Sequence, residues 1–165
     1  MANSNNDSRN YKELLSNRQK FTNFLRRFVK SDWVKFVDEE NLRLCDEGFF
    51  GFQSDESESV VTYAATVEGR DVYFYVMLES AVDYTIPMRI LGHTGTIMTR
   101  IFENTRKEDK EREDYRLPAV VPIVYYFGSQ NWDIPHSFKD YLQGGGLPAV
   151  TIDFKYTLVD INHTT

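Results

Sequence analysis

The pattern of apolar and polar residues predicts an amphipathic helix near the N-terminus. Between Tyr11 and Lys30 the apolar side chains recur at three- and four-residue spacing, at Leu14, Leu15, Phe21, Phe24, Leu25, Phe28 and Val29. A second short element starts at Asp32. Residues 1–8 are small and polar, which predicts a disordered N-terminal tail, so the folded domain is expected to span residues 9–165.

Two alternating runs in the middle of the chain predict a β-hairpin. Residues 60–68 and 71–79 are rich in β-branched and aromatic side chains, and Gly69-Arg70 between them suits a two-residue type II′ turn. That turn fixes the register of the two strands. One face is then apolar throughout and must be buried, and on the other face Val60 lies opposite Glu79.

The second half of the chain predicts a helical crossover between parallel strands. Thr85 and Pro87 are typical of a helix start, and apolar positions continue the helical pattern to Phe102. Residues 119–127 are apolar throughout, as in a strand covered on both faces, and residues 150–161 predict a last strand. A long helix between strands implies a parallel βαβ step. The order of elements indicates a single α/β domain with a mixed β-sheet flanked by helices.

Composition and charge restrict the possible partners. The chain has 165 residues, 41% of them apolar, and a single cysteine, Cys45, which excludes an internal disulfide framework. No apolar run has membrane-spanning length and no secretory leader pattern is present, so we expect a cytoplasmic protein without a membrane partner. The net charge is −6, yet residues 9–35 carry eight basic side chains against two acidic ones. This basic segment could contact a polyanion, and the first candidates for DNA contact are Lys12, Arg18, Arg26 and Arg27.

Most catalytic motifs are absent from the sequence. The three histidines are scattered without metal-ligand spacing, no G-x-S-x-G elbow occurs, and the glycine run 144–146 lacks the residues of a phosphate loop. Glu79 is the exception, because it ends an apolar strand. A carboxylate there, opposite a second one, could hold Mg²⁺ for phosphodiester hydrolysis. A strand-end glutamate is also common as a structural or solvated residue.

Six stretches of the chain, taken in order, match a known family: NYKELLSNRQKFTNFLRRFVKSDWVKFVDEENL, GRDVYFYVMLE, VDYTIPMRIL, LPAVVPIVYYFGSQNW, SFKDYL and DFKYTLVDIN. Over residues 8–162 the sequence resembles the recombination-promoting nuclease (Rpn) family of bacterial YhgA-like transposases. The resemblance implies a PD-(D/E)XK (restriction-endonuclease-like) fold. It also implies Mg²⁺-dependent DNA endonuclease activity in DNA recombination.

The resemblance places the family's glutamate at Glu79, but the other catalytic positions are changed. The family's aspartate falls on Val60, and its Gln or Lys falls on Ala81 or in a two-residue deletion. We therefore expect a pseudonuclease with weak or no Mg²⁺ binding. It would bind DNA or a partner, such as a second copy or an active relative, without cutting. One alternative is an active endonuclease that uses Glu79 with Glu58 or Asp83.

A purely protein-binding module is a further alternative. In the predicted register Tyr73, Tyr75 and Met77 share the face of Glu79 and could meet a partner protein. The same side chains are equally compatible with an ordinary core beneath a covering helix, which the pattern favours.

Overall fold

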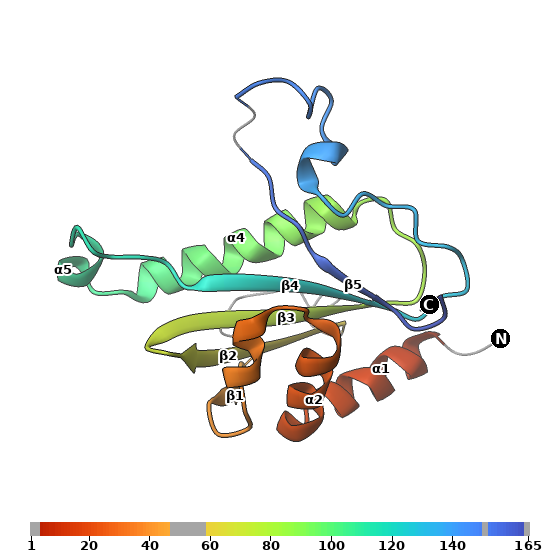
Figure 1. Ribbon diagram of the computed structural model, residues 1–165, viewed down its shortest axis with the longest axis horizontal. Coiled ribbons are helices and arrows are strands. Elements are labelled where there is room, and N and C mark those ends of the chain that lie inside the picture. The colour runs from red at the N-terminus through yellow and green to blue at the C-terminus, as the bar shows by residue number, and fades with distance from the viewer. Residues whose placement is uncertain (1–3, 47–58, 150–151, 164–165) are drawn as a thin grey trace.

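The computed structural model describes residues 4–46, 59–149 and 152–163, and these build a mixed sheet flanked by helices (Figure 1). The five strands of the described residues are β1 Leu42–Leu44, β2 Val60–Val67, β3 Arg70–Glu79, β4 Ala119–Tyr126 and β5 Thr157–Asp160. The helices are α1 Ser4–Leu15, α2 Arg18–Phe28, α4 Ile86–Asn104 and α5 Lys107–Lys110, with short 3₁₀ turns η1 Asp32–Phe36 and η3 Phe138–Tyr141. The strands lie in chain order, β1 to β5. β1, β2 and β3 pair antiparallel, whereas β3, β4 and β5 pair parallel.

Helices cover both faces of the sheet. Figure 1 shows α4 along one face, and α1 and α2 against the other. Alternate residues of β3 therefore enter two different cores: Phe74 and Val76 pack with α1 and α2, and Tyr75 and Met77 pack beneath α4. The predicted α/β class, with a mixed sheet between helices in one domain, is confirmed.

The N-terminal helix is broken where the sequence predicted continuity. α1 ends at Leu15 and α2 begins at Arg18, because the side chain of Asn17 caps the second helix and accepts a hydrogen bond from the Lys20 N–H at 3.1 Å. α1 also begins earlier than predicted, at Ser4. The prediction of a disordered tail over residues 1–8 is therefore wrong for residues 4–8, and residues 1–3 lie outside the described residues.

The hairpin turn lies one residue earlier than predicted. Its central residues are Glu68 and Gly69, with φ of 51° and 76°, so the turn is of type I′ and Val67 pairs with Arg70. The predicted type II′ turn at Gly69-Arg70 is wrong. The register consequently shifts by two residues, which keeps every side chain on its predicted face. Val60 pairs with Met77, and the predicted pairing of Val60 with Glu79 is wrong.

The crossover is as the sequence predicted. α4 begins directly after Thr85, with Pro87 at its second position, and leads into β4, which pairs parallel to β3 over its whole length. β5 is shorter than the predicted strand over residues 150–161, and residues 150 and 151 lie outside the described residues. Within the described ranges, none of the helices combines the length and the apolar character needed to cross a membrane.

Stacked aromatic rings attach the N-terminal helices to the sheet. The ring of Phe21 lies 4.0 Å from that of Tyr63, and both side chains are fully buried. The Tyr63 hydroxyl donates a 2.7 Å hydrogen bond to the carbonyl of Leu15, where α1 ends. This contact fixes the junction between α1 and α2 against the middle of β2.

Substitutions in the turn test the observed register. Glu68→Asn is expected to raise the free energy of unfolding by about 0.5 kcal/mol, because asparagine adopts the left-handed conformation at lower cost than glutamate. Gly69→Ala is expected to lower it by about 1 kcal/mol through its positive φ alone, because an added Cβ would meet no atom within 4 Å. Urea denaturation measures both changes.

Arg70→Asn is the matched control for the turn. Arg70 lies in β3 opposite Val67, where asparagine has low strand propensity, so this change should not stabilise the protein. Stabilisation by Arg70→Asn, with none from Glu68→Asn, would contradict the type I′ turn.

Candidate active site at the carboxyl ends of the parallel strands

Glu79 is the last residue of β3 and lies on the face of the sheet that α4 covers. It follows Met77 by two residues, and Met77 packs in the core beneath α4. The Glu79 side chain is only 12% exposed. A carboxylate buried to this degree needs a compensating charge or hydrogen bonds.

Arg89 supplies this charge from the first turns of α4. Its Nη1 atom lies 2.9 Å from Oε1 of Glu79 and 3.0 Å from Oδ2 of Asp83. The guanidinium donates a hydrogen bond to Asp83 and forms an ion pair with the buried Oε1 of Glu79. Arg89 thus joins the end of β3, the following loop and α4 through one cation.

Asp83 also holds the backbone at the start of α4 by hydrogen bonds. Its Oδ1 accepts hydrogen bonds from the backbone N–H of Thr85 at 2.9 Å and from the Thr85 hydroxyl at 2.6 Å. Burial tends to raise the pKa of Asp83, but the hydrogen bonds from Thr85 and Arg89 outweigh it and hold this pKa below its ordinary value. Burial raises the pKa of Glu79, and Arg89 offsets only part of that rise.

The ends of β4 and β5 add two polar residues to the same edge. Tyr126 is in register with Glu79, and Asp160 is in register with Tyr126. Both lie on the face of α4, two residues beyond Val124 and Leu158 of the core beneath it. Asp160 is in contact with His163, whose Nδ1 lies 3.0 Å from Oδ2, and its Oδ1 accepts the N–H groups of Asn162 and His163.

The described residues of this edge do not fit a Mg²⁺ ion. Mg²⁺ requires oxygen ligands at about 2.1 Å in octahedral geometry. The guanidinium of Arg89 already lies about 3 Å from both carboxylates, so a second cation would have to displace it. Nowhere in the described ranges do three His, Cys, Asp or Glu side chains form a group that could hold a metal ion.

Val60 and Ala81, the positions of the family's other catalytic residues, bring no polar side chain to Glu79. Val60 is buried in the core beneath α4 and pairs with Met77. Ala81 is exposed in the loop between β3 and α4. Glu58, the predicted second ligand, lies outside the described residues.

The predicted DNA contacts do not share one surface. Arg18 and Arg26 reach back to the chain after η1, where they donate hydrogen bonds to the carbonyls of Glu39 at 3.5 Å and Val37 at 2.9 Å. Lys12 lines a small hollow beside Cys45, on a different part of the surface. Arg27 lies with its guanidinium carbon 5.2 Å from the ring centroid of Phe28. Of the four, Arg27 is the one placed over an aromatic surface.

Two of the three side chains considered for protein binding are covered. Tyr75 and Met77 are fully buried beneath α4, and the Tyr75 hydroxyl donates to the carbonyl of Ile90 at 3.1 Å. Tyr73 is half-buried on the same face. Burial raises the pKa of the Cys45 thiol to about 11, so it stays protonated and unreactive at neutral pH.

The arrangement of elements is that of a restriction-endonuclease-like domain: a hairpin, a crossover helix and a parallel strand, with a glutamate at the end of the second hairpin strand. The chain belongs to the family described as "Putative transposase, YhgA-like", whose model matches residues 6–165. This confirms the predicted family. Neither a curated protein nor a solved structure matches the chain.

Sequence reasoning missed the part that Arg89 plays. The signal was present in VDYTIPMRIL, where an arginine follows Asp83 by six residues across a helix start. It also missed Tyr126 and Asp160, because their alignment with Glu79 depends on how three strands pair.

Removal of Arg89 should destabilise the fold through Glu79. Arg89→Met leaves a buried carboxylate without a cation, and we expect a loss of about 2 kcal/mol, less than for a fully buried pair because Arg89 is 26% exposed. Glu79→Gln in the same chain should restore part of this loss, because the neutral amide needs no counter-charge. Urea denaturation of the single and double variants gives the coupling energy.

Arg112→Met is the matched control for this cycle. Arg112 pairs with Asp114 on an exposed surface, where an ion pair contributes little, so no measurable change is expected. Equal losses in the two arginine variants, or strictly additive effects of Glu79→Gln and Arg89→Met, would contradict the coupling.

Proposed function

We propose that this chain is a member of the nuclease family that binds DNA without cutting it. The observation that carries the proposal is the position of Arg89, within 3.0 Å of both Glu79 and Asp83. Metal-dependent hydrolysis needs a cation that is open to water and to the phosphate. An arginine between the two carboxylates supplies the counter-charge, but it is not a Lewis acid and cannot activate a bound water as a metal ion does.

The neighbouring acids support the same conclusion. Asp160 is in contact with His163 and accepts two backbone N–H groups. Asp133, on the loop after β4, accepts hydrogen bonds from the Tyr84 hydroxyl at 2.8 Å and 2.9 Å. These carboxylates therefore already have hydrogen-bonding partners within the protein.

Ala81 removes another requirement of catalysis. By the family resemblance, a Gln or Lys belongs near this position, where it would assist the reacting phosphate. A methyl group can neither donate a hydrogen bond nor carry a charge. The described part of this edge thus lacks a complete set of groups for hydrolysis, while the fold of the family is retained.

An active endonuclease is the second candidate, and the observed register removes one argument against it. Because Val60 pairs with Met77, the argument that a valine faces Glu79 no longer holds. In this candidate Glu58 supplies the second carboxylate.

Plasmid cleavage distinguishes these two candidates. With supercoiled plasmid and Mg²⁺ or Mn²⁺, we expect the wild-type protein to nick DNA no faster than the Glu79→Ala variant, while both still retard DNA at low salt, where phosphate contacts are strongest. Cutting that is lost in Glu79→Ala would contradict the proposal. If Glu58→Ala abolished it too, the second candidate would be supported.

Mg²⁺ binding by an Arg89 variant tests, without an activity assay, whether Arg89 excludes a metal ion from Glu79 and Asp83. In Arg89→Met the two carboxylates lose their cation, so Mg²⁺ should raise the melting temperature of this variant but not that of the wild type. Glu79→Gln/Arg89→Met is the control, and its response to Mg²⁺ should be absent. A similar Mg²⁺ response in wild type and Arg89→Met would show that Arg89 does not exclude the ion.

A further inference from the structure

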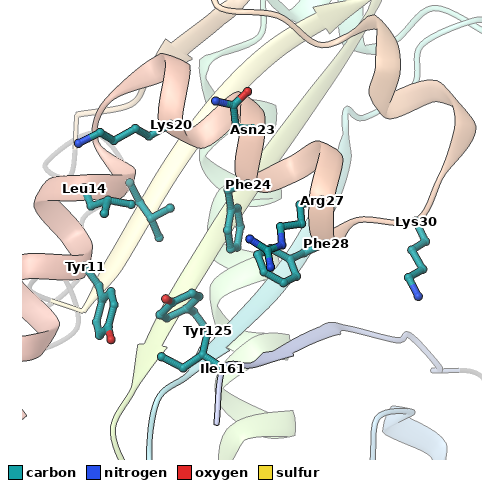
Figure 2. Close-up of a pocket in the computed structure, with 11 residues that line it drawn as sticks. Tyr11, Leu14, Lys20, Asn23, Phe24, Arg27, Phe28, Lys30, Tyr125 and Ile161 are labelled. Carbon is teal, nitrogen blue, oxygen red and sulfur yellow. The ribbon is translucent and has the colours of Figure 1, made fainter. Parts of the chain in front are cut away.

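A hollow of about 580 Å³ lies between α1, α2 and the carboxyl ends of β4 and β5, on the opposite side of the sheet from α4 (Figure 2). This volume is typical of ligand sites. Among the described residues, no acidic side chain lines it. We call it the α1–α2 groove.

Three cations border the α1–α2 groove. Lys20, Arg27 and Lys30 are exposed and line it, with Lys20 and Lys30 toward its opposite ends (Figure 2). Lys20 and Arg27 are seven residues apart, so they share one face of α2 and are separated by about 10 Å along its axis. Within the described ranges none of the three forms an ion pair. The groove is therefore a basic site on an acidic protein.

Aromatic rings form the floor of the groove. Phe28 lies 5.3 Å from Phe24, Phe24 lies 5.9 Å from Tyr125, and Tyr125 lies 4.9 Å from Tyr11. Phe28, Tyr125 and Tyr11 are only half-buried, so part of each residue is accessible, and Arg27 lies with its guanidinium carbon 5.2 Å from the Phe28 ring centroid. Burial and the neighbouring Tyr11 raise the pKa of Tyr125 to about 12, so its hydroxyl stays neutral beside a phosphate.

We propose that the α1–α2 groove binds single-stranded DNA, with bases stacked on the row of rings and phosphates held by Lys20, Arg27 and Lys30. A cationic groove combined with accessible rings is the arrangement that recognises unpaired nucleotides, because every base has a face that stacks. In a duplex these faces are already stacked on one another. This inference rests on the proposed DNA-binding function and specifies the form of DNA and the surface.

The length of the groove favours a strand over a mononucleotide. Lys20 and Arg27 alone lie about 10 Å apart along α2, and Lys30 extends the row of cations further. A single phosphate group is much smaller than this span. The row of rings also continues to Phe127, 4.8 Å from Tyr11. The Phe127 N–H donates to the carbonyl of Glu79 at 3.0 Å, so the row ends beside the strand edge that presents the family's glutamate.

Fluorescence anisotropy with a labelled oligothymidine tests the site. The variant Lys20→Gln/Arg27→Gln/Lys30→Gln is expected to bind at least tenfold more weakly. The slope of log K against log salt concentration should decrease in magnitude by about 2, because each lost phosphate contact contributes about 0.7 for a single strand. The matched control is Arg106→Gln/Lys107→Gln/Arg112→Gln, which makes the same change in net charge at the other end of β4 and should bind as the wild type does. Equal weakening in both triple variants would overturn the proposal, as would no weakening in either.

Base stacking is tested separately. Phe28→Leu keeps an apolar side chain and should weaken oligothymidine binding roughly tenfold, whereas Phe36→Leu, an exposed ring outside the groove, should not. Neither change should affect binding of an abasic deoxyribose-phosphate chain. Equal affinity of the wild type for the abasic chain and the oligothymidine, or tighter binding of the corresponding duplex, would overturn the inference.

The outcomes separate this inference from the proposed function. Plasmid cutting that depends on Glu79 would contradict the proposed function and leave the groove result unaffected. DNA binding that persists unchanged in the Lys20, Arg27 and Lys30 triple variant would contradict the groove alone.

Discussion

The burial of β3 on both faces is the constraint on which the rest of the structure depends. Phe74 packs against α2 while Tyr75 packs beneath α4, so this strand cannot turn either face to water. Its covered length ends at Glu79, where the carboxylate is still largely desolvated. A charge in that position needs an internal partner, and Arg89 meets this requirement from the helix that covers the strand.

The local patterns of the sequence predict the elements but not their alignment. Thr85 and Pro87 mark the start of α4 because capping and the fixed φ of proline act within one turn. The hairpin turn was misplaced because Gly69 suits either the second position of a type I′ turn or the first of a type II′ turn. The alternation of apolar residues cannot decide between them, because a shift of two residues leaves both faces unchanged.

The candidate site shows the same division between local and tertiary information. Glu79 could be found from sequence because the apolar strand ends there. Arg89 could not, because its contact with Glu79 forms only after the intervening loop has turned the chain into α4. Likewise Arg26 and Arg27 are adjacent in sequence, yet one side chain bonds the carbonyl of Val37 and the other borders the α1–α2 groove. Only the packing of α2 distinguishes them.

The candidate site and the α1–α2 groove lie on opposite faces of the sheet, as the proposed DNA binding without catalysis requires. Glu79 and Arg89 lie on the face of α4, and the α1–α2 groove lies on the other face of the sheet, so changes at one leave the side chains of the other in place. With a Debye length of about 8 Å at physiological salt, a polyanion responds to the nearby cations more than to the net charge of −6. The cations of the groove therefore outweigh the net charge at that surface, which the proposed DNA binding requires. The backbone hydrogen bond from Phe127 to Glu79 joins the end of the row of rings to the edge of the sheet where Arg89 lies beside Glu79.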